Sequence, residues 1–289
     1  MRTGVPDVLH APWMEGAMLR CPCPTVVTVH DLTQLKRRSE ALRTGLRQRL
    51  RHLAVQRAMR VVVPTRAVAD DVVAELGVER RRVLVIPHAA DPVMRPRDER
   101  EVASVRHRFK LPERYLVWVG ALQHPDPTKH VRELAAAPRK LPLVMVGPTR
   151  PWAHELPEVT LTGKVSDEQL AAIYSGAHAL VLSSESEGFG LPGVEALACG
   201  TPVSACRARA LVEVLGERAT FVPRGDMRSL IAAAEAASRP APAPPPWSWR
   251  DAARATWSAY ASALADAAAQ RDGSRAMRRR PRRPGVEGA

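Results

Sequence analysis

Six short runs of β-branched and other apolar residues alternate with helical patterns between Tyr115 and Pro223. This alternation predicts an α/β fold with a parallel sheet covered by helices on both faces. Six strands are the number expected for a complete doubly wound nucleotide-binding domain. The predicted strands are Tyr115–Gly120, Pro142–Gly147, Val159–Gly163, Ala179–Ser183, Pro202–Ala205 and Thr220–Pro223, and the predicted helices are Val131–Pro138, Ser166–Ser175, Leu191–Cys199, Leu211–Gly216 and Met227–Ala237.

The residues before this domain contain only four predicted strands, Pro6–His10, Thr25–His30, Arg60–Pro64 and Val83–His88. Helical patterns cover about 36–58 and 66–76, the second ending at Gly77. Because a doubly wound domain has about six strands, we expect the first domain to be incomplete and the chain to be N-terminally truncated. The predicted organisation is an incomplete Rossmann-like domain (1–108), a second Rossmann-like domain (109–238), a Pro-rich linker with a closing helix (239–270) and a disordered Arg-rich tail (271–289).

Composition excludes several classes of protein. Hydrophobic residues make up 45% of the chain, which is ordinary for a globular protein. No apolar run reaches the roughly 20 residues needed to span a bilayer, and the first residues do not resemble a signal peptide. The four cysteines have neither zinc-site spacing nor the density of a disulfide framework. We therefore expect a cytoplasmic protein with reduced cysteines.

The net charge of +13 is concentrated in two segments. Residues 36–60 contain nine Lys or Arg and one Glu, and residues 271–287 contain seven Arg and two acids. Leucines at 42, 46, 50 and 53 recur at helical spacing, so we expect them to pack on the sheet and the arginines at 43, 47, 49 and 51 to face elsewhere. A solvated helix face, anionic lipid or nucleic acid would each fit this charge. We expect a peripheral position on the inner membrane face and no nucleic-acid partner.

The segment with the most chemical information runs from Glu187 to Val203, where a predicted strand leads through a glycine-rich loop into a helix. Backbone N–H groups at Gly190 and Leu191 would be free at the helix N-terminus, where the helix dipole favours an anion. Glu187 and Glu195 lie on either side of this anion site, and carboxylates accept hydrogen bonds from sugar hydroxyls. A nucleotide sugar has the matching order of hexose, diphosphate and ribose.

The pattern Gly188-x-Gly190-x-x-Gly193 is also a dinucleotide-binding fingerprint, which leaves an NAD(P)-dependent oxidoreductase as an alternative. However, the preceding strand is the fourth of its domain and not the first, and Glu187 would place a negative charge beside the pyrophosphate. Glu213, at the spacing of a ribose-binding acid, falls in a helical stretch.

At these residues the sequence resembles the family-4 retaining glycosyltransferases of the GT-B fold, over most of Pro6 to Tyr260. Their signature is two glutamates separated by seven residues, here Glu187 and Glu195, with Gly-Phe-Gly-Leu-Pro between them. The resemblance implies that Glu187 contacts the donor sugar and Glu195 the ribose. It also implies that the backbone at Phe189, Gly190 and Leu191 holds the sugar and phosphate region.

Other segments match the same family. The strand ending at Gly120, with Lys129 in the loop after it, resembles the element that supplies a basic pair to the diphosphate, although Thr128 stands where many members have Arg. Arg66 and Arg150 are candidates for the missing charge. The loop containing Val165 resembles the part that receives the base. The strand-end His30 resembles the histidine near the reacting carbon, which implies a catalytic role.

The implied function is retaining transfer of a hexose from a nucleotide sugar to a glycan, lipid carrier or small molecule, without a cofactor. No D-x-D pair occurs, so we expect no metal, and Lys129 with the helix N-terminus would stabilise the leaving group. A phosphorylase-like or epimerase-like relative would use the same scaffold, but the pyridoxal lysine segment of phosphorylases is not found. A remnant that binds nucleotide sugar without turnover is the other alternative.

Overall fold

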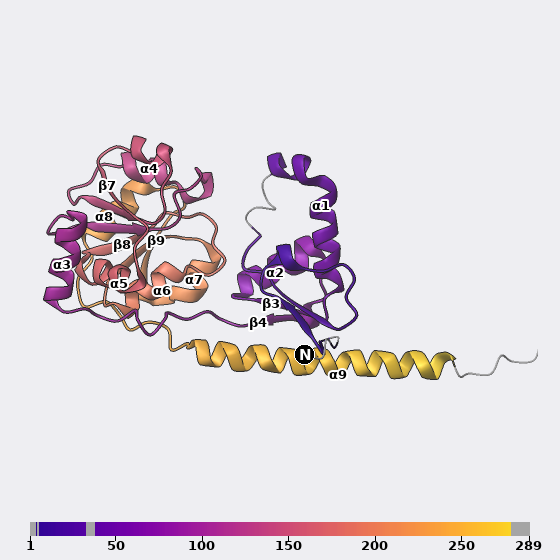
Figure 1. Cartoon of the computed structure of the whole chain (residues 1–289). Helices are drawn as coiled ribbons and strands as arrows, with labels where there is room; N and C mark the ends of the chain where they lie inside the picture. The colour runs from indigo at the N-terminus through magenta and orange to yellow at the C-terminus, as the bar shows by residue number, and fades with distance from the viewer. Residues whose placement is uncertain (1–3, 5, 33–37, 279–289) are drawn as a thin grey trace, which may run out of the picture.

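The computed structural model describes residues 4, 6–32 and 38–278, apart from side chains in parts of the first and last helices. They form two α/β units, each built on a parallel sheet, with a long helix running along one side of the first (Figure 1). None of the helices within these ranges is both long and apolar enough to cross a membrane.

The first unit contains a four-stranded parallel sheet in which the strands pair in sequence order. Valines of the central strands are buried on both faces of the sheet, which agrees with the β-branched runs in the sequence. Its elements are β1 (Leu9–Ala11), β2 (Thr25–Thr28), α1 (Arg38–Arg57), β3 (Arg60–Val63), α2 (Arg66–Leu76) and β4 (Val83–Val85).

The second unit contains a six-stranded parallel sheet in the order β10-β9-β8-β5-β6-β7. This is a doubly wound sheet, as the sequence predicts, and the order of the strands reverses between β5 and β8. The strands are β5 (Leu116–Val119), β6 (Leu143–Val146), β7 (Val159–Gly163), β8 (Ala179–Leu182), β9 (Val203–Cys206) and β10 (Ala219–Val222). The helices associated with this sheet are α3 (Glu99–Phe109), α4 (Val131–Ala136), α5 (Asp167–Gly176), α6 (Leu191–Ala198), α7 (Arg209–Leu215) and α8 (Met227–Glu235).

Helix α3 was not predicted, and it corrects the domain boundary predicted after residue 108. The helix begins with a capping box in which Asp98 and Glu101 bind each other's backbone N–H groups. It packs against α5, and its Val105 and Phe109 contact the core of the second sheet. The second unit therefore begins with α3, before the predicted boundary.

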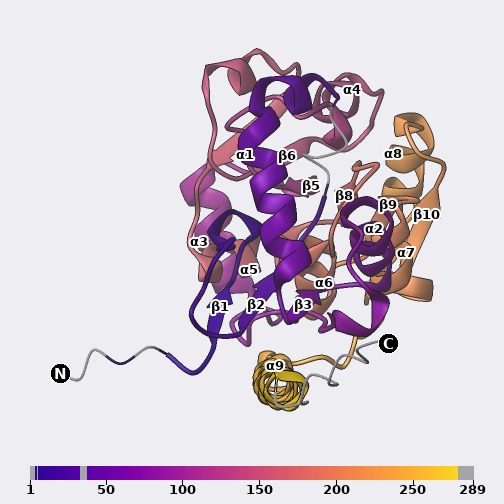
Figure 2. The ribbon, with the colours of Figure 1, turned by 90° about the vertical axis from the view of Figure 1, so that its right-hand side faces the viewer.

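The last helix, α9 (Trp249–Arg278), belongs in space to the first unit (Figures 1 and 2). Its Ala259 and Ala263 are buried against strands β2 and β3. Arg60 of β3 forms an ion pair of 2.9 Å with Asp266. The helix continues eight residues past the predicted limit of 270. The rest of the predicted disordered tail, residues 279–289, lies outside the described residues.

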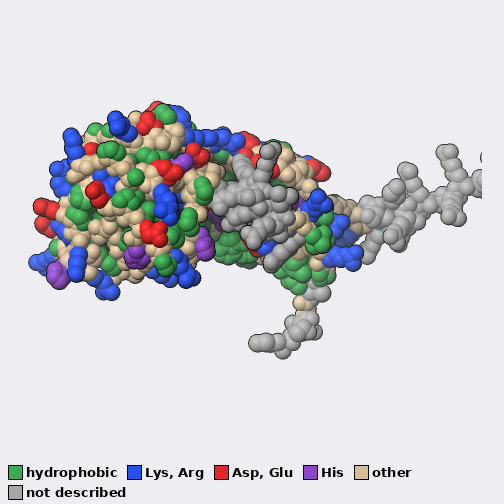
Figure 3. Space-filling view, turned by 90° about the horizontal axis from the view of Figure 1, so that it is seen from above, with side chains coloured by type: hydrophobic (Ala, Val, Ile, Leu, Met, Phe, Trp, Pro, Cys, Tyr) green, Lys and Arg blue, Asp and Glu red, His purple; other side chains and the backbone are tan. Residues whose placement is uncertain are grey.

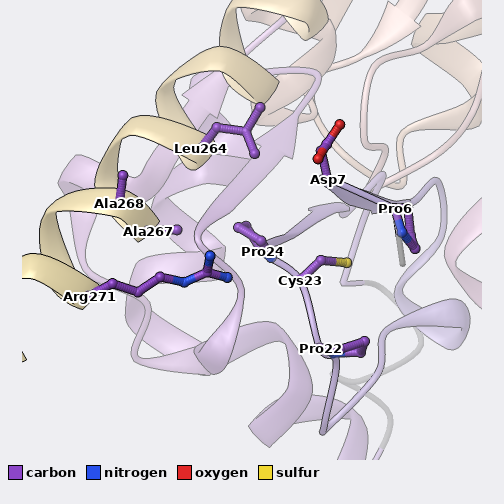
Figure 4. A pocket seen from close by; sticks show the side chains of 9 residues that line it. All are labelled: Pro6, Asp7, Pro22, Cys23, Pro24, Leu264, Ala267, Ala268 and Arg271. Carbon is purple, nitrogen blue, oxygen red and sulfur yellow. The ribbon is translucent and has the colours of Figure 1, made fainter. Parts of the chain in front are cut away.

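A cavity of about 370 Å³ lies between α9 and the start of the first sheet (Figure 4). Leu264 and Arg271 line it from α9, and Cys23 lines it from the opposite side. The Sγ atoms of Cys21 and Cys23 are 3.2 Å apart. All four cysteines are free thiols, as expected from their spacing.

The prediction that the α1 leucines pack on the sheet is wrong for those that the structure describes. Leu46 is 74% exposed, and Leu50 and Leu53 are 42% and 41% exposed. The end of α1 and the residue after it are buried instead through Ala54, Val55 and Ala58. The start of α1 projects beyond the sheet (Figure 1), and Leu53 is exposed although it directly precedes the buried Ala54 and Val55. The leucines therefore lie on a different face of the helix from the residues that pack on the core. The side chains of Leu42, Arg43 and Arg47 lie outside the described residues.

Candidate functional site

The carboxyl ends of β5 and β8 lie next to each other at the point where the strand order reverses. Ligands of doubly wound sheets bind at this position, because the loops from the two strands diverge there and leave a crevice. The loop after β5 begins at Gly120 and carries Lys129, and the loop after β8 carries Glu187. The fold thus brings two of the predicted site segments to one edge of the sheet.

Hydrogen bonds join these two loops directly. The Ser183 hydroxyl donates to the carbonyl of Lys129, and the Glu185 N–H donates to the carbonyl of Thr128 at 2.8 Å. Glu185 also pairs with the ring of His130 at 2.8 Å. The backbone that carries Lys129 is therefore fixed beside the loop that carries Glu187.

Glu187 experiences opposing electrostatic effects. Burial raises the pKa of its carboxyl, while a hydrogen bond with Ser184 and the charge of Lys129 act to lower that pKa. The nearby carboxylates of Asp31 and Asp126 raise this pKa, because they disfavour a second negative charge. The predicted partners Glu187 and Lys129 are thus close enough to interact.

Thr128 does not replace the arginine that the family resemblance suggests. Its hydroxyl donates to Asp126 at 2.7 Å, and its backbone N–H donates to the same carboxylate oxygen at 3.0 Å. Thr128 therefore stabilises the turn that presents Lys129. The two proposed substitutes, Arg66 and Arg150, lie at exposed positions outside this turn.

The helix after the β8 loop starts as the sequence predicts. Gly190 has a φ of 85° at the N-cap of α6, and a Cβ atom at this position would overlap the side chain of Leu211. Pro192 occupies the first turn, where a missing N–H leaves no hydrogen bond unmade. Phe189 is 4% exposed and Leu191 packs on the same core. Because these side chains pack on the core, a ligand can approach the backbone closely at the N-terminus of α6.

The β8 loop also contacts the first unit. A Cβ atom on Gly188 would overlap the carbonyl oxygen of His30, so only glycine allows the two backbones to meet here. The Thr65 hydroxyl donates to the Gly188 carbonyl at 3.0 Å. This contact brings the end of β2, with His30, to the loop that carries Glu187.

Both ring nitrogens of His30 have partners. Nδ1 lies 3.2 Å from Nε2 of His88, and Nε2 lies 3.0 Å from the carbonyl oxygen of Pro12. The His88 ring contacts Phe189 edge-on and stacks on Trp249 at the start of α9. The sequence pattern placed His88 only at the end of the predicted strand Val83–His88. One sequence signal could have linked His88 to the site: it follows β4 as His30 follows β2.

Glu195 lies in the second turn of α6. Its carboxylate accepts a hydrogen bond of 3.2 Å from the Tyr174 hydroxyl. Burial raises the pKa of this carboxyl to about 7, and the charges of Asp167 and Asp91 act in the same direction. Val165, predicted to receive the base, is half-buried against the same core.

The position of Glu213 argues against the dinucleotide alternative. Its carboxylate accepts hydrogen bonds from the backbone N–H groups of Arg66 at 2.7 Å and Ala67 at 3.0 Å, which form the first turn of α2. Glu213 therefore caps a helix of the other unit. The glycine fingerprint also follows β8 and not β5, the first strand of its sheet.

Two parallel α/β units that meet at a glycine-rich loop, with a C-terminal helix returning to the first unit, define a GT-B glycosyltransferase fold. HepE from Anabaena, solved in complex with UDP and glucose, has a TM-score of 0.64 at 19% identity and is matched over 79% of this chain and 67% of its own. Sucrose-phosphate synthase from Thermosynechococcus elongatus has a TM-score of 0.63 at 22% identity, over 94% of this chain and 73% of its own. The predicted fold class is confirmed.

Sequence comparisons place the chain within this fold. The family described as Glycosyltransferase Family 4 matches residues 1–93, and Glycosyl transferases group 1 matches residues 113–239. The chain belongs to the family-4, group 1 glycosyltransferases.

Curated relatives agree with this assignment. The D-inositol 3-phosphate glycosyltransferase of Mycolicibacterium smegmatis is 31% identical over 229 residues, which are 70% of this chain and 52% of the relative. The 2-deoxystreptamine glucosyltransferase of Streptomyces kanamyceticus is 29% identical over 180 residues, which are 57% of this chain and 46% of the relative. The chain thus spans about half the length of these curated relatives.

Proposed function

We propose that this protein transfers a hexose from a nucleotide sugar to an acceptor, with retention at the anomeric carbon and without a metal. The observation that carries the proposal is the meeting of Lys129, Glu187 and the α6 N-terminus at the switch point of the second sheet. The relatives named as glycosyltransferases support transfer, and HepE with bound UDP and glucose supports a nucleotide-sugar donor.

In this proposal the bond between the anomeric carbon and the diphosphate oxygen breaks while the acceptor oxygen bonds to the same carbon. The acceptor proton passes to the departing diphosphate, which keeps the reaction balanced. Lys129 and the N–H groups at the start of α6 stabilise the charge that develops on the leaving group. Among the described residues, no three His, Cys, Asp or Glu side chains are grouped to hold a metal ion.

Within the site, Glu187 and His30 would contact the sugar and Glu195 the ribose. Carboxylates at the two ends can each accept hydroxyl hydrogen bonds, and the positive charge of Lys129 lies beside Glu187. Gly120 and Val165 would border the diphosphate and the base. The second candidate function is binding of the donor without turnover. It is favoured by the observation that both ring nitrogens of His30 already have partners.

A thermal-shift panel of GDP-, UDP- and ADP-sugars tests donor binding. One nucleotide class should raise the melting temperature by about 5 °C or more at 100 times its Kd, because binding then adds about 2.7 kcal/mol to stability. The matching free hexose is the control and should give no shift. Absence of a shift with every nucleotide sugar would contradict the proposal. A shift without product formation, assayed against glycan, lipid and small-molecule acceptors, would select the binding-only candidate.

We also propose that α1 docks on an anionic membrane surface. Leu46 and Leu50 are exposed on a helix whose described neighbours include the exposed Arg49. Apolar side chains beside arginines suit the boundary between headgroups and acyl chains. By contrast, Lys and Arg are spread over the second unit among acidic side chains in the view of Figure 3. The exposed leucines of α1 make the first unit the part that we expect to contact lipid.

Co-sedimentation with vesicles tests this docking. The protein should bind anionic vesicles and be released at 1 M salt, where the Debye length falls to about 3 Å. Leu46→Ser with Leu50→Ser should weaken binding, since burial of each leucine contributes about 1.5–3 kcal/mol. Trp257→Ser, at an exposed aromatic of α9, is the control and should bind as the wild type does. Equal binding to neutral and anionic vesicles would refute the docking.

A further inference from the structure

The pair formed by His30 and His88 connects three parts of the molecule. His30 follows β2, and His88 follows β4 in the segment that leads to the second unit. The two rings lie with centroids 5.3 Å apart, and Nδ1 of His30 is 3.2 Å from Nε2 of His88. The other nitrogen of His30, Nε2, lies 3.0 Å from the Pro12 carbonyl oxygen.

The partners of these nitrogens determine where the protons are. A carbonyl oxygen can only accept, so Nε2 of His30 must carry the proton that it shares with Pro12. A neutral imidazole has one N–H group, so Nδ1 of His30 is an acceptor. His88 must then donate from its Nε2. In this arrangement His30 can donate its Nε2–H group to a ligand, and neither of its ring nitrogens has a free lone pair.

The surroundings of His88 are consistent with this donor role. Burial is the largest effect that lowers the pKa of His88 to about 4, and protonation of His30 would lower it further. A neutral ring at physiological pH is required for the proton arrangement described above. The ring is held in place by Phe189, at a centroid distance of 5.1 Å, and by Trp249, at 5.4 Å. Phe189 belongs to the donor loop, so the orientation of His88 depends on assembly of both units.

We propose that His88 is a positioning residue that keeps the proton of His30 on Nε2, so that His30 acts on the donor sugar as a hydrogen-bond donor and not as a base. The part of this inference that concerns the sugar rests on the proposed function. The part that concerns the proton positions does not. A sugar oxygen that replaces the Pro12 carbonyl would meet an N–H group already in place. A sugar hydroxyl can both donate and accept, so once it replaces the Pro12 carbonyl only the N–H group of His88 keeps the proton off Nδ1. Loss of His88 would then allow the proton to move to Nδ1.

The proton arrangement can be measured without activity, by long-range ¹H–¹⁵N NMR of the histidine rings in the full chain. His30→Gln identifies the His30 signals. The wild type should show a protonated Nε2 and an unprotonated Nδ1, both alone and with a nucleotide sugar bound. His88→Leu should keep this form alone, where the Pro12 carbonyl holds the proton, and show both tautomers with the nucleotide sugar bound. His88→Gln, whose amide N–H can still donate to Nδ1, should restore the wild-type form. A protonated Nδ1 in the wild type, or an unchanged tautomer in sugar-bound His88→Leu, would overturn the proposal.

Kinetics provide the second readout. His88→Leu should lower kcat about 10- to 100-fold, the range seen when the partner that orients a functional imidazole is removed, with the KM for the donor unchanged. His88→Gln should recover most of the loss, and His107→Gln, at an exposed histidine of α3, should match the wild type. A loss in His88→Leu that His88→Gln does not relieve contradicts the positioning role. Absence of transfer in the wild type would defeat the proposed function, while the NMR result would still decide the proton arrangement.

Discussion

Lys129→Ala is expected to weaken binding of a nucleoside diphosphate about 10- to 150-fold and to leave binding of the nucleoside unchanged. The lost interaction is a hydrogen bond between two charged groups, which contributes about 1.5–3 kcal/mol. The Lys129 backbone is held by Ser183, so removing its side chain should leave the loop in place. Calorimetry with the two ligands measures the difference.

Lys140→Ala is the matched control for this prediction. Lys140 is an exposed lysine before β6, at the opposite end of the second sheet from the switch point. The Lys140→Ala variant should bind both ligands as the wild type does. Equal losses for nucleoside and nucleoside diphosphate in Lys129→Ala would mean that Lys129 maintains the fold and does not contact phosphate.

Glu195→Gln is expected to weaken nucleoside binding while making the protein more stable above pH 7. The pKa of the buried carboxyl is about 7, against an ordinary value of 4.5. Between these two values the folded state holds a proton that the unfolded state has released, so stability falls as pH rises through this interval. The neutral amide removes this effect and can still accept from Tyr174. The amide also takes the place of a charged group that would accept hydrogen bonds from ribose hydroxyls, so the free energy of nucleoside binding should weaken by about 1.5–3 kcal/mol.

The comparison requires melting temperatures at pH 4 and pH 8 and nucleoside affinity at pH 8. The two proteins should differ little in stability at pH 4, because Glu195 is then protonated in both states. Glu217→Gln, at an exposed glutamate, should follow the wild type at both values. Equal binding of nucleoside by the variant and the wild type would remove Glu195 from the proposed ribose site. A variant less stable than the wild type at pH 8 would contradict the raised pKa of Glu195.

The sequence patterns were sufficient for the strands and for the start of the helix at the switch point of the second sheet. Runs of valine and leucine locate β5 and β8, and the glycines with Pro192 locate the start of α6. These features depend on neighbouring residues, so they can be inferred locally. The capping box at Asp98 and Glu101 is equally local and would have revealed α3.

The contacts between the two units could not be inferred in this way. His88 meets His30 across 58 residues, and Glu213 caps α2 across 147 residues. Nothing in the local pattern around His88 or Glu213 indicates which partner it will have. The α1 leucines show the same limit, because helical spacing defines a face but not whether the sheet extends beneath it.

Helix α9 affects the order in which the protein can fold on the ribosome. The strands of the first unit are synthesised early, yet their core includes Ala259 and Ala263. About 160 residues separate the end of β4 from the start of α9, which at roughly 5–20 residues per second is about 10–30 s of synthesis. During this interval one face of the first sheet is exposed, and by its end all strands of the second unit have been synthesised. The unit that emerges first is therefore the last to be completed.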